Sequence, residues 1–118
     1  NSIDDIDLVA IFGNLMDNAL SSAIHSEEKH ISLETTVRNG YHVIVITNSC
    51  DSPPITHGGK LVTKKEDKKL HGYGLKSVAK TLKKYSGDFS WEYNDLTRMF
   101  VVTAMVGDKR HNHSLNKT

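Results

Sequence analysis

Hydrophobic residues recur at three- and four-residue intervals from Ile6 to Ile24, which is the periodicity of an amphipathic helix. The apolar positions inside this run are Leu8, Val9, Phe12, Leu15, Met16, Ala19, Leu20 and Ala23. Asp4, Asp5 and Asp7 stand at its beginning, where the positive end of the helix dipole favours negative charge. The pattern therefore predicts a first helix over Ile6–Ile24.

Two runs rich in β-branched residues follow, Ile31–Val37 and His42–Thr47. They are joined through Arg38-Asn39-Gly40-Tyr41, and Asn-Gly is a strong hairpin signal because both residues tolerate positive φ. We expect an antiparallel pair of strands. The periodicity then stops from Asn48 to His71, a stretch with paired prolines, paired glycines and many lysines, for which we predict a long loop.

A second amphipathic pattern runs from Tyr73 to Ser86 and predicts a helix that ends at Gly87. Its apolar face holds Leu75, Val78, Ala79, Leu82 and Tyr85, and its other face holds Lys76, Lys80, Lys83 and Lys84. Two more strands are predicted, Asp88–Tyr93 and Met99–Val106, with a turn between them at Asn94-Asp95.

This order of elements predicts an α+β fold: a two-layer sandwich with helices on one face of a mixed, largely antiparallel sheet. The chain has 118 residues, of which 37% are apolar and 25% charged, which suits one soluble domain over residues 1–106 and a polar tail over 107–118. A single cysteine, Cys50, excludes an internal disulfide. Because the first residue is Asn1 rather than Met, we interpret the chain as a fragment.

Charge is divided unevenly along the chain, although the net charge is only +1. Residues 1–59 hold 2 basic and 8 acidic side chains, whereas residues 60–118 hold 13 basic and 6 acidic ones. The second half therefore suits an anionic ligand, and a solvated lysine-rich surface is the alternative. Few aromatic residues lie among these lysines, so we do not expect nucleic-acid binding.

Three small groups of residues suggest chemistry. Asn14 and Asn18 lie one turn apart on the first helix, where amide oxygens can hold a hard cation or its waters. Gly72 and Gly74 lie at the start of the second helix, whose free backbone N–H groups can bind an anion. Asn48, at the end of a strand, is either a turn former or a reader of a purine amine.

Taken together, these features resemble the ATP-binding domain of the GHKL superfamily. The stretch from Asn14 to Ala19 resembles the N box of histidine kinases, and Val45–Asn48 falls where the first glycine box ends its strand. Thr63-Lys64-Lys65 resembles the Ser/Thr-Lys element of the lid, and His71–Leu75 resembles the second glycine box. Within the superfamily the chain is most similar to the peptide-sensing quorum kinases of the Agr type and their citrate-sensor relatives.

The resemblance implies a role for each matching residue. Asn18 would coordinate Mg²⁺ that bridges the ATP phosphates, and Asn14 would orient water or phosphate. Asn48 would face the adenine amine. The phosphate-binding residues would be His71, Gly72, Tyr73, Gly74 and Leu75, closed over by Thr63, Lys64 and Lys65 from the lid.

The sequence departs from the family pattern after Asn48. The usual Asp-x-Gly-x-Gly is replaced by Asn48-Ser49-Cys50-Asp51-Ser52, which lacks both glycines. Asp51 is therefore an alternative adenine partner if the register shifts by three residues. The family also supplies a strand before the first helix and, farther upstream, a helical hairpin with the phosphorylated histidine, and this sequence holds neither.

The implied function is the ATP-binding domain of a membrane-bound sensor histidine kinase, on the cytoplasmic side of the membrane. It would pass the γ-phosphoryl of ATP to a histidine on an upstream dimerisation domain of the same protein, which signals to a response regulator. The full-length protein would be a homodimer and the fragment a monomer that binds ATP without autophosphorylating. The alternatives are a serine protein kinase of the anti-sigma type and an interaction module that has lost nucleotide binding.

Overall fold

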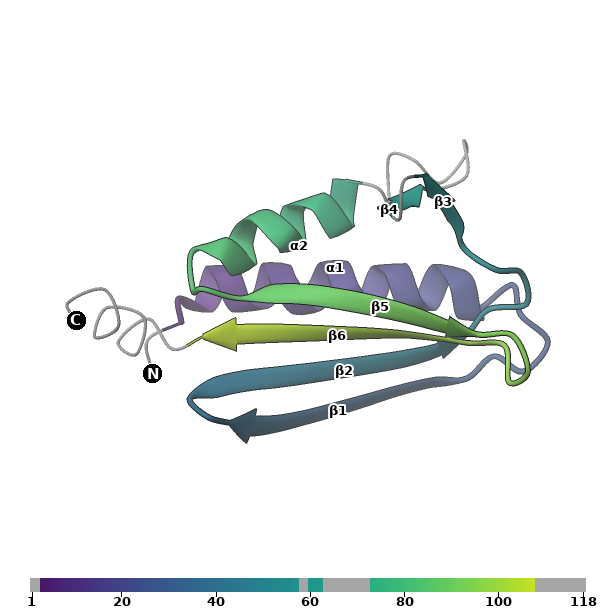
Figure 1. Ribbon diagram of the computed structural model, residues 1–118, viewed down its shortest axis with the longest axis horizontal. Coiled ribbons are helices and arrows are strands. Elements are labelled where there is room, and N and C mark those ends of the chain that lie inside the picture. Colours follow the sequence, from purple (N-terminus) through teal and green to yellow (C-terminus); the bar gives the residue numbers. More distant parts are fainter. Residues whose placement is uncertain (1–2, 58–59, 63–72, 108–118) are drawn as a thin grey trace.

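The computed structural model describes residues 3–57, 60–62 and 73–107. Two helices, α1 (Asp5–Ala23) and α2 (Tyr73–Lys83), lie on one face of a four-stranded sheet (Figure 1). The predicted α+β sandwich is confirmed. Neither helix, within the described part of the chain, is long and apolar enough to cross a membrane.

The sheet consists of β1 (Ile31–Arg38), β2 (Tyr41–Ser49), β5 (Asp88–Asn94) and β6 (Met99–Gly107). Their order is β1-β2-β6-β5, and every pairing among these strands is antiparallel. Asn39 and Gly40 connect β1 to β2 with φ values of 54° and 84°, as a two-residue turn with positive φ at both positions requires. The hairpin predicted from Asn-Gly is therefore confirmed.

The stretch predicted as a long loop contains two short strands, so the prediction of a loop was wrong at those residues. β3 (Ile55–His57) and β4 (Lys60–Val62) pair antiparallel in a separate two-stranded sheet. Strands of three residues are too short to show a period of two, although a Gly-Gly step between two short runs is a hairpin signal. Figure 1 shows this hairpin beyond the N-terminal end of α2.

One hydrophobic core fills the space between the helices and the sheet. Successive side chains of β2 and β6 point to opposite faces of the sheet. Ile44 and Ile46 face the helices, together with the even-numbered residues of β6. The cluster is made up of Ile3, Ile11, Leu15, Ala19, Ile44, Ile46, Leu75, Val78, Leu82, Tyr85, Phe100, Val102, Ala104 and Val106. This core fixes both helices against the sheet and so positions the residues that they carry.

Helix α2 ends earlier than predicted, at Lys83 rather than Ser86. Ser86 itself takes the left-handed conformation, with φ of 53°, and the Gly87 N–H donates to the Leu82 carbonyl at 2.8 Å. The left-handed residue is thus Ser86 and not Gly87. A glycine is needed at position 87 because a Cβ there would overlap the carbonyl oxygen of Met105. The glycine therefore permits close packing of the chain on β6.

Candidate functional site

Asp7 shows which flank of α1 faces α2. The Tyr85 hydroxyl, just after α2, donates to Asp7 Oδ2 at 2.5 Å, and Lys84 Nζ lies 3.4 Å from Asp7 Oδ1. A helix turns about 100° per residue, so positions seven and eleven residues after Asp7 return to the same flank. These positions are Asn14 and Asn18. The two predicted amides therefore share the flank that faces α2.

The helices run antiparallel, with the beginning of α1 beside the end of α2 (Figure 1). At about 1.5 Å per residue, Asn18 lies roughly 16 Å along α1 from Asp7, and Tyr73 lies roughly 15 Å back along α2 from Lys83, the last helical residue before Tyr85. Asn18 is thus level with the start of α2. Asn14 and Asn18 are both half-buried, and their side chains make no hydrogen bond to another described residue. The structure thus turns the N-box amides toward the start of the second helix.

The second helix begins at Tyr73, as predicted, and its first turn contains no acidic residue. The first N–H groups of any helix lack partners inside the helix and carry partial positive charge. Leu75 is buried in the core, so only its backbone remains to contact a ligand. His71, Gly72 and the lid residues Thr63, Lys64 and Lys65 lie outside the described residues.

Asn48 is a buried amide at the end of β2, with only 1% of its surface exposed. It lies on the face of β2 that carries Ile44 and Ile46, which is the face covered by the helices. Its Nδ2 donates to the Ser49 carbonyl at 2.9 Å, whereas its Oδ1 accepts no hydrogen bond from any residue that the structure describes. Across the sheet it is in register with Phe100. A buried acceptor without a donor thus stands beside an aromatic ring.

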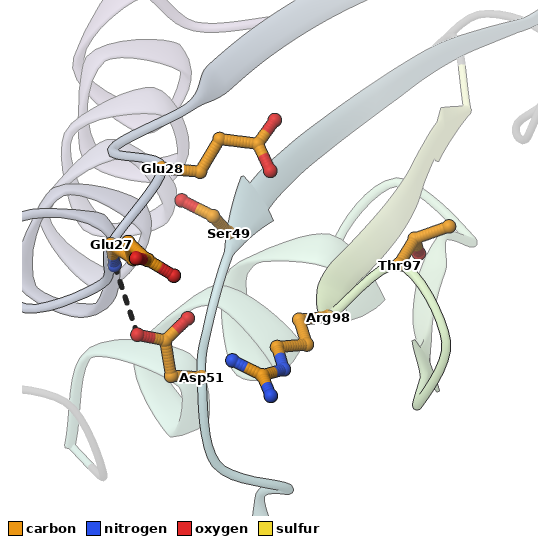
Figure 2. Close-up of a pocket in the computed structure, with 6 residues that line it drawn as sticks. All are labelled: Glu27, Glu28, Ser49, Asp51, Thr97 and Arg98. Atoms are coloured by element: carbon orange, nitrogen blue, oxygen red, sulfur yellow. Dashed lines mark hydrogen bonds between the residues drawn. The ribbon is translucent and has the colours of Figure 1, made fainter.

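Asp51, the alternative adenine partner, lies at the surface instead. Its Oδ2 accepts the backbone N–H of Glu27 at 2.9 Å, which ties the chain after β2 to the loop after α1 (Figure 2). It lines a pocket of about 240 Å³ that also includes Glu27, Glu28, Ser49, Thr97 and Arg98. None of the three predicted asparagines lines this pocket. The two alternative adenine partners therefore differ in their surroundings, because Asn48 is buried between the helices and the sheet and Asp51 is at the surface.

A pair of buried serines that the sequence analysis did not single out joins α1 to the end of β2. Ser49 Oγ and Ser26 Oγ share a hydrogen bond of 2.6 Å, and Ser26 Oγ also donates to the Ala23 carbonyl at 2.7 Å. The His30 N–H donates to Ser49 Oγ at 2.8 Å. These bonds fix the C-terminal end of α1 against the strand end that carries Asn48. Serines are common in turns, so the sequence held no signal for this role.

Two tyrosines hold the chain around the site. The Tyr93 hydroxyl donates to the Cys50 carbonyl at 2.6 Å, and the Cys50 N–H donates to the Arg98 carbonyl at 2.9 Å. The pKa of Tyr93 is raised, chiefly by burial. The pKa of Tyr85 is raised by burial first and then by its hydrogen bond to Asp7. Both phenols therefore stay neutral to a higher pH than a solvent-exposed tyrosine.

No curated protein matches the chain. A family model described as the GHKL domain matches residues 3–106, which is almost the whole described structure. GHKL domains bind ATP, typically with Mg²⁺. The fold of two helices on a four-stranded sheet agrees with this match, and the chain belongs to the GHKL family of ATP-binding domains.

Proposed function

We propose that this domain binds ATP with Mg²⁺ between the amide flank of α1 and the start of α2. The observation that carries this proposal is the orientation of α1, since the contact between Asp7 and Tyr85 turns Asn14 and Asn18 toward the start of α2. A hard cation and a polyphosphate suit these two features, because amide oxygens are cation ligands and a helix start favours anions.

The buried amide of Asn48 suits the adenine base. A buried acceptor without a donor costs about 1–3 kcal/mol, and the exocyclic amine of adenine is a donor of the right kind. The Ser49 carbonyl orients the amide, because only the Nδ2 end can donate to it. Oδ2 of Asp51 already accepts a hydrogen bond from the backbone N–H of Glu27. Asn48 is therefore the better candidate for the base.

The chain's own residues position the nucleotide, and ATP supplies the phosphoryl group. Asn18 holds Mg²⁺, Asn14 orients water or phosphate, and the first N–H groups of α2 neutralise phosphate charge. Phosphoryl transfer depends mainly on such positioning and charge stabilisation. The acceptor in this proposal is a histidine on a separate segment of a membrane-bound sensor kinase, which would signal to a response regulator in quorum sensing.

Calorimetric titration with ATP, with and without Mg²⁺, tests the nucleotide site. We expect binding by the wild type and a loss of at least about tenfold in Mg²⁺-dependent affinity in Asn18→Ala, because the variant removes an oxygen ligand of the cation and even residues that only support metal ligands contribute about 10- to 100-fold to metal affinity. Gly13→Ala is the matched control, because Gly13 is exposed with open space around it. Asn18→Ala that binds Mg²⁺·ATP as well as Gly13→Ala does would refute the metal role.

One observation favours a second candidate, a GHKL interaction module without nucleotide binding. The chain after Asn48 lacks the glycines of the family pattern. Hydrogen bonds also hold it in place, from Cys50 to Tyr93 and Arg98 and from Asp51 to Glu27. No binding by the wild type at millimolar ATP would favour this module over the kinase. Transfer of label from ATP to a histidine-bearing upstream segment, added as a separate chain, would instead support the histidine kinase.

A further inference from the structure

The amide of Asn48 is held in one orientation by the backbone that follows it. Its Nδ2 donates to the carbonyl of Ser49 at 2.9 Å. An amide has a donor end and an acceptor end, and a carbonyl accepts only from the donor end. Oδ1 is therefore the end that is left for a ligand, and no residue that the structure describes donates to it.

The Ser49 carbonyl is directed by its own peptide unit. The bond between Ser49 and Cys50 is planar and trans, so the Ser49 carbonyl and the Cys50 N–H point in opposite directions. The Cys50 N–H donates to the Arg98 carbonyl at 2.9 Å, which fixes this plane. The Tyr93 hydroxyl donates to the next carbonyl, that of Cys50, at 2.6 Å. The turn between β5 and β6 thus directs the Ser49 carbonyl toward Asn48.

The loop after α1 fixes the other side of Ser49. The Ser49 N–H donates to the His30 carbonyl at 2.9 Å, and the His30 N–H donates to Ser49 Oγ at 2.8 Å. Ser49 Oγ also shares a hydrogen bond with Ser26 Oγ. Ser49 is only 1% exposed, so bulk water does not compete for these bonds. The carbonyl that orients Asn48 therefore cannot turn without breaking bonds to two separate loops.

This arrangement suits an amide at position 48 and disfavours the aspartate of the family pattern. An ionised carboxylate has acceptors only, so one of its oxygens would face the Ser49 carbonyl oxygen at about the 2.9 Å that the hydrogen bond now spans. Two buried acceptors at this distance repel each other and leave both groups without a donor. The backbone around Ser49 is therefore matched to Asn48.

We propose that Ser49 is a positioning residue of the nucleotide site, whose carbonyl makes Asn48 Oδ1 a fixed acceptor and makes an amide necessary at position 48. The inference rests on the nucleotide site proposed above. A base with an amine at position 6 satisfies Oδ1, whereas a base with a carbonyl there meets an acceptor that cannot turn away. The choice between these bases then depends on the hydrogen bonds behind Asn48.

Calorimetric titration of the full chain with Mg²⁺·ATP tests the need for an amide. Asn48→Asp should bind ATP at least about tenfold more weakly than the wild type near neutral pH, because the carboxylate loses the bond to Ser49 and repels its carbonyl. Asn94→Asp is the matched control. Asn94 Oδ1 accepts the N–H groups of Leu96 and Thr97, and a carboxylate keeps both bonds.

Lower pH should rescue Asn48→Asp. A protonated carboxyl has one O–H donor for the Ser49 carbonyl and one acceptor for the base, as the amide has. Burial raises the pKa of a carboxyl, so the affinity of this variant for ATP should rise by at least about threefold between about pH 7.5 and about pH 5.5. The wild type at the same two pH values is the control for other groups that titrate in this range.

Inosine triphosphate, which carries a carbonyl at position 6, tests the orientation of the amide without any variant. The wild type should bind it at least about tenfold more weakly than ATP. Equal affinities overturn the inference, because the amide then turns freely. So does an Asn48→Asp variant, shown by urea unfolding to be folded, that binds ATP as tightly as Asn94→Asp or loses the same affinity at both pH values. No binding of ATP by the wild type overturns the nucleotide site itself together with this inference.

Discussion

Removal of the Tyr85 hydroxyl should destabilise the domain by about 2 kcal/mol. Tyr85 is 1% exposed, and its hydroxyl donates to Asp7 Oδ2 at 2.5 Å and accepts the Asp4 N–H at 3.2 Å. A hydrogen bond to a charged group contributes about 1.5–3 kcal/mol. Because the Asp7 side chain keeps Lys84 nearby and 15% of its surface in contact with solvent, we expect the lower half of that range for Tyr85→Phe.

Urea unfolding followed by circular dichroism measures this loss directly, and 2 kcal/mol should lower Tm by roughly 8 °C in a domain of this size. Tyr93→Phe is the matched control, because it removes a hydroxyl bond to a neutral carbonyl, worth about 1 kcal/mol. In an Asp7→Asn background the effect of Tyr85→Phe should shrink. A loss for Tyr85→Phe no larger than that for Tyr93→Phe would show that Asp7 does not orient α1 through this bond.

The remaining predictions concern the same scaffold. Ser49→Ala should cost about 1–3 kcal/mol in chemical unfolding, because the His30 N–H loses its acceptor, and an unchanged free energy would exclude the serine pair as a fixed link. Stability should fall as pH rises above about 10, because the raised pKa values of Tyr85 and Tyr93 mean that the unfolded chain releases these protons first, and the double Phe variant should show a flatter alkaline profile. Gly13→Ala should raise the free energy of unfolding by up to about 1 kcal/mol, since an exposed helical glycine with open space around it gains helix propensity, and a loss would reveal a contact at that position. Gly87→Ala should lower Tm strongly, because its Cβ would overlap the Met105 carbonyl, and a wild-type Tm would show that the chain can shift there.

Most of the fold could be predicted because each main element has several periods of its pattern. The helix predicted over Ile6–Ile24 is observed over Asp5–Ala23, and the Asn-Gly turn fixed the register of β1 and β2. Errors occurred where an element was short or where tertiary contact overrode local preference. β3 and β4 are too brief to show alternation, and helix α2 stops three residues before the predicted end, Ser86, which itself takes positive φ.

The candidate site could be predicted only in part, for a physical reason. Helical spacing showed that Asn14 and Asn18 share one flank, but only the long-range bond from Tyr85 to Asp7 showed that this flank faces α2. Spacing likewise could not decide between Asn48 and Asp51, which differ in burial and in their partners. Contacts between residues far apart in sequence, such as Ser26 with Ser49, leave no local pattern from which they can be predicted.

Both ends of α1 are fastened, by Tyr85 at its beginning and by the Ser26–Ser49 pair at its end. These two contacts fix the backbone of α1, so the Cα positions of Asn14 and Asn18 relative to β2 and α2 are set during folding. Part of the entropy cost of bringing separate elements together into a site is therefore met before any ligand arrives, and the two amide side chains are left to be ordered on binding.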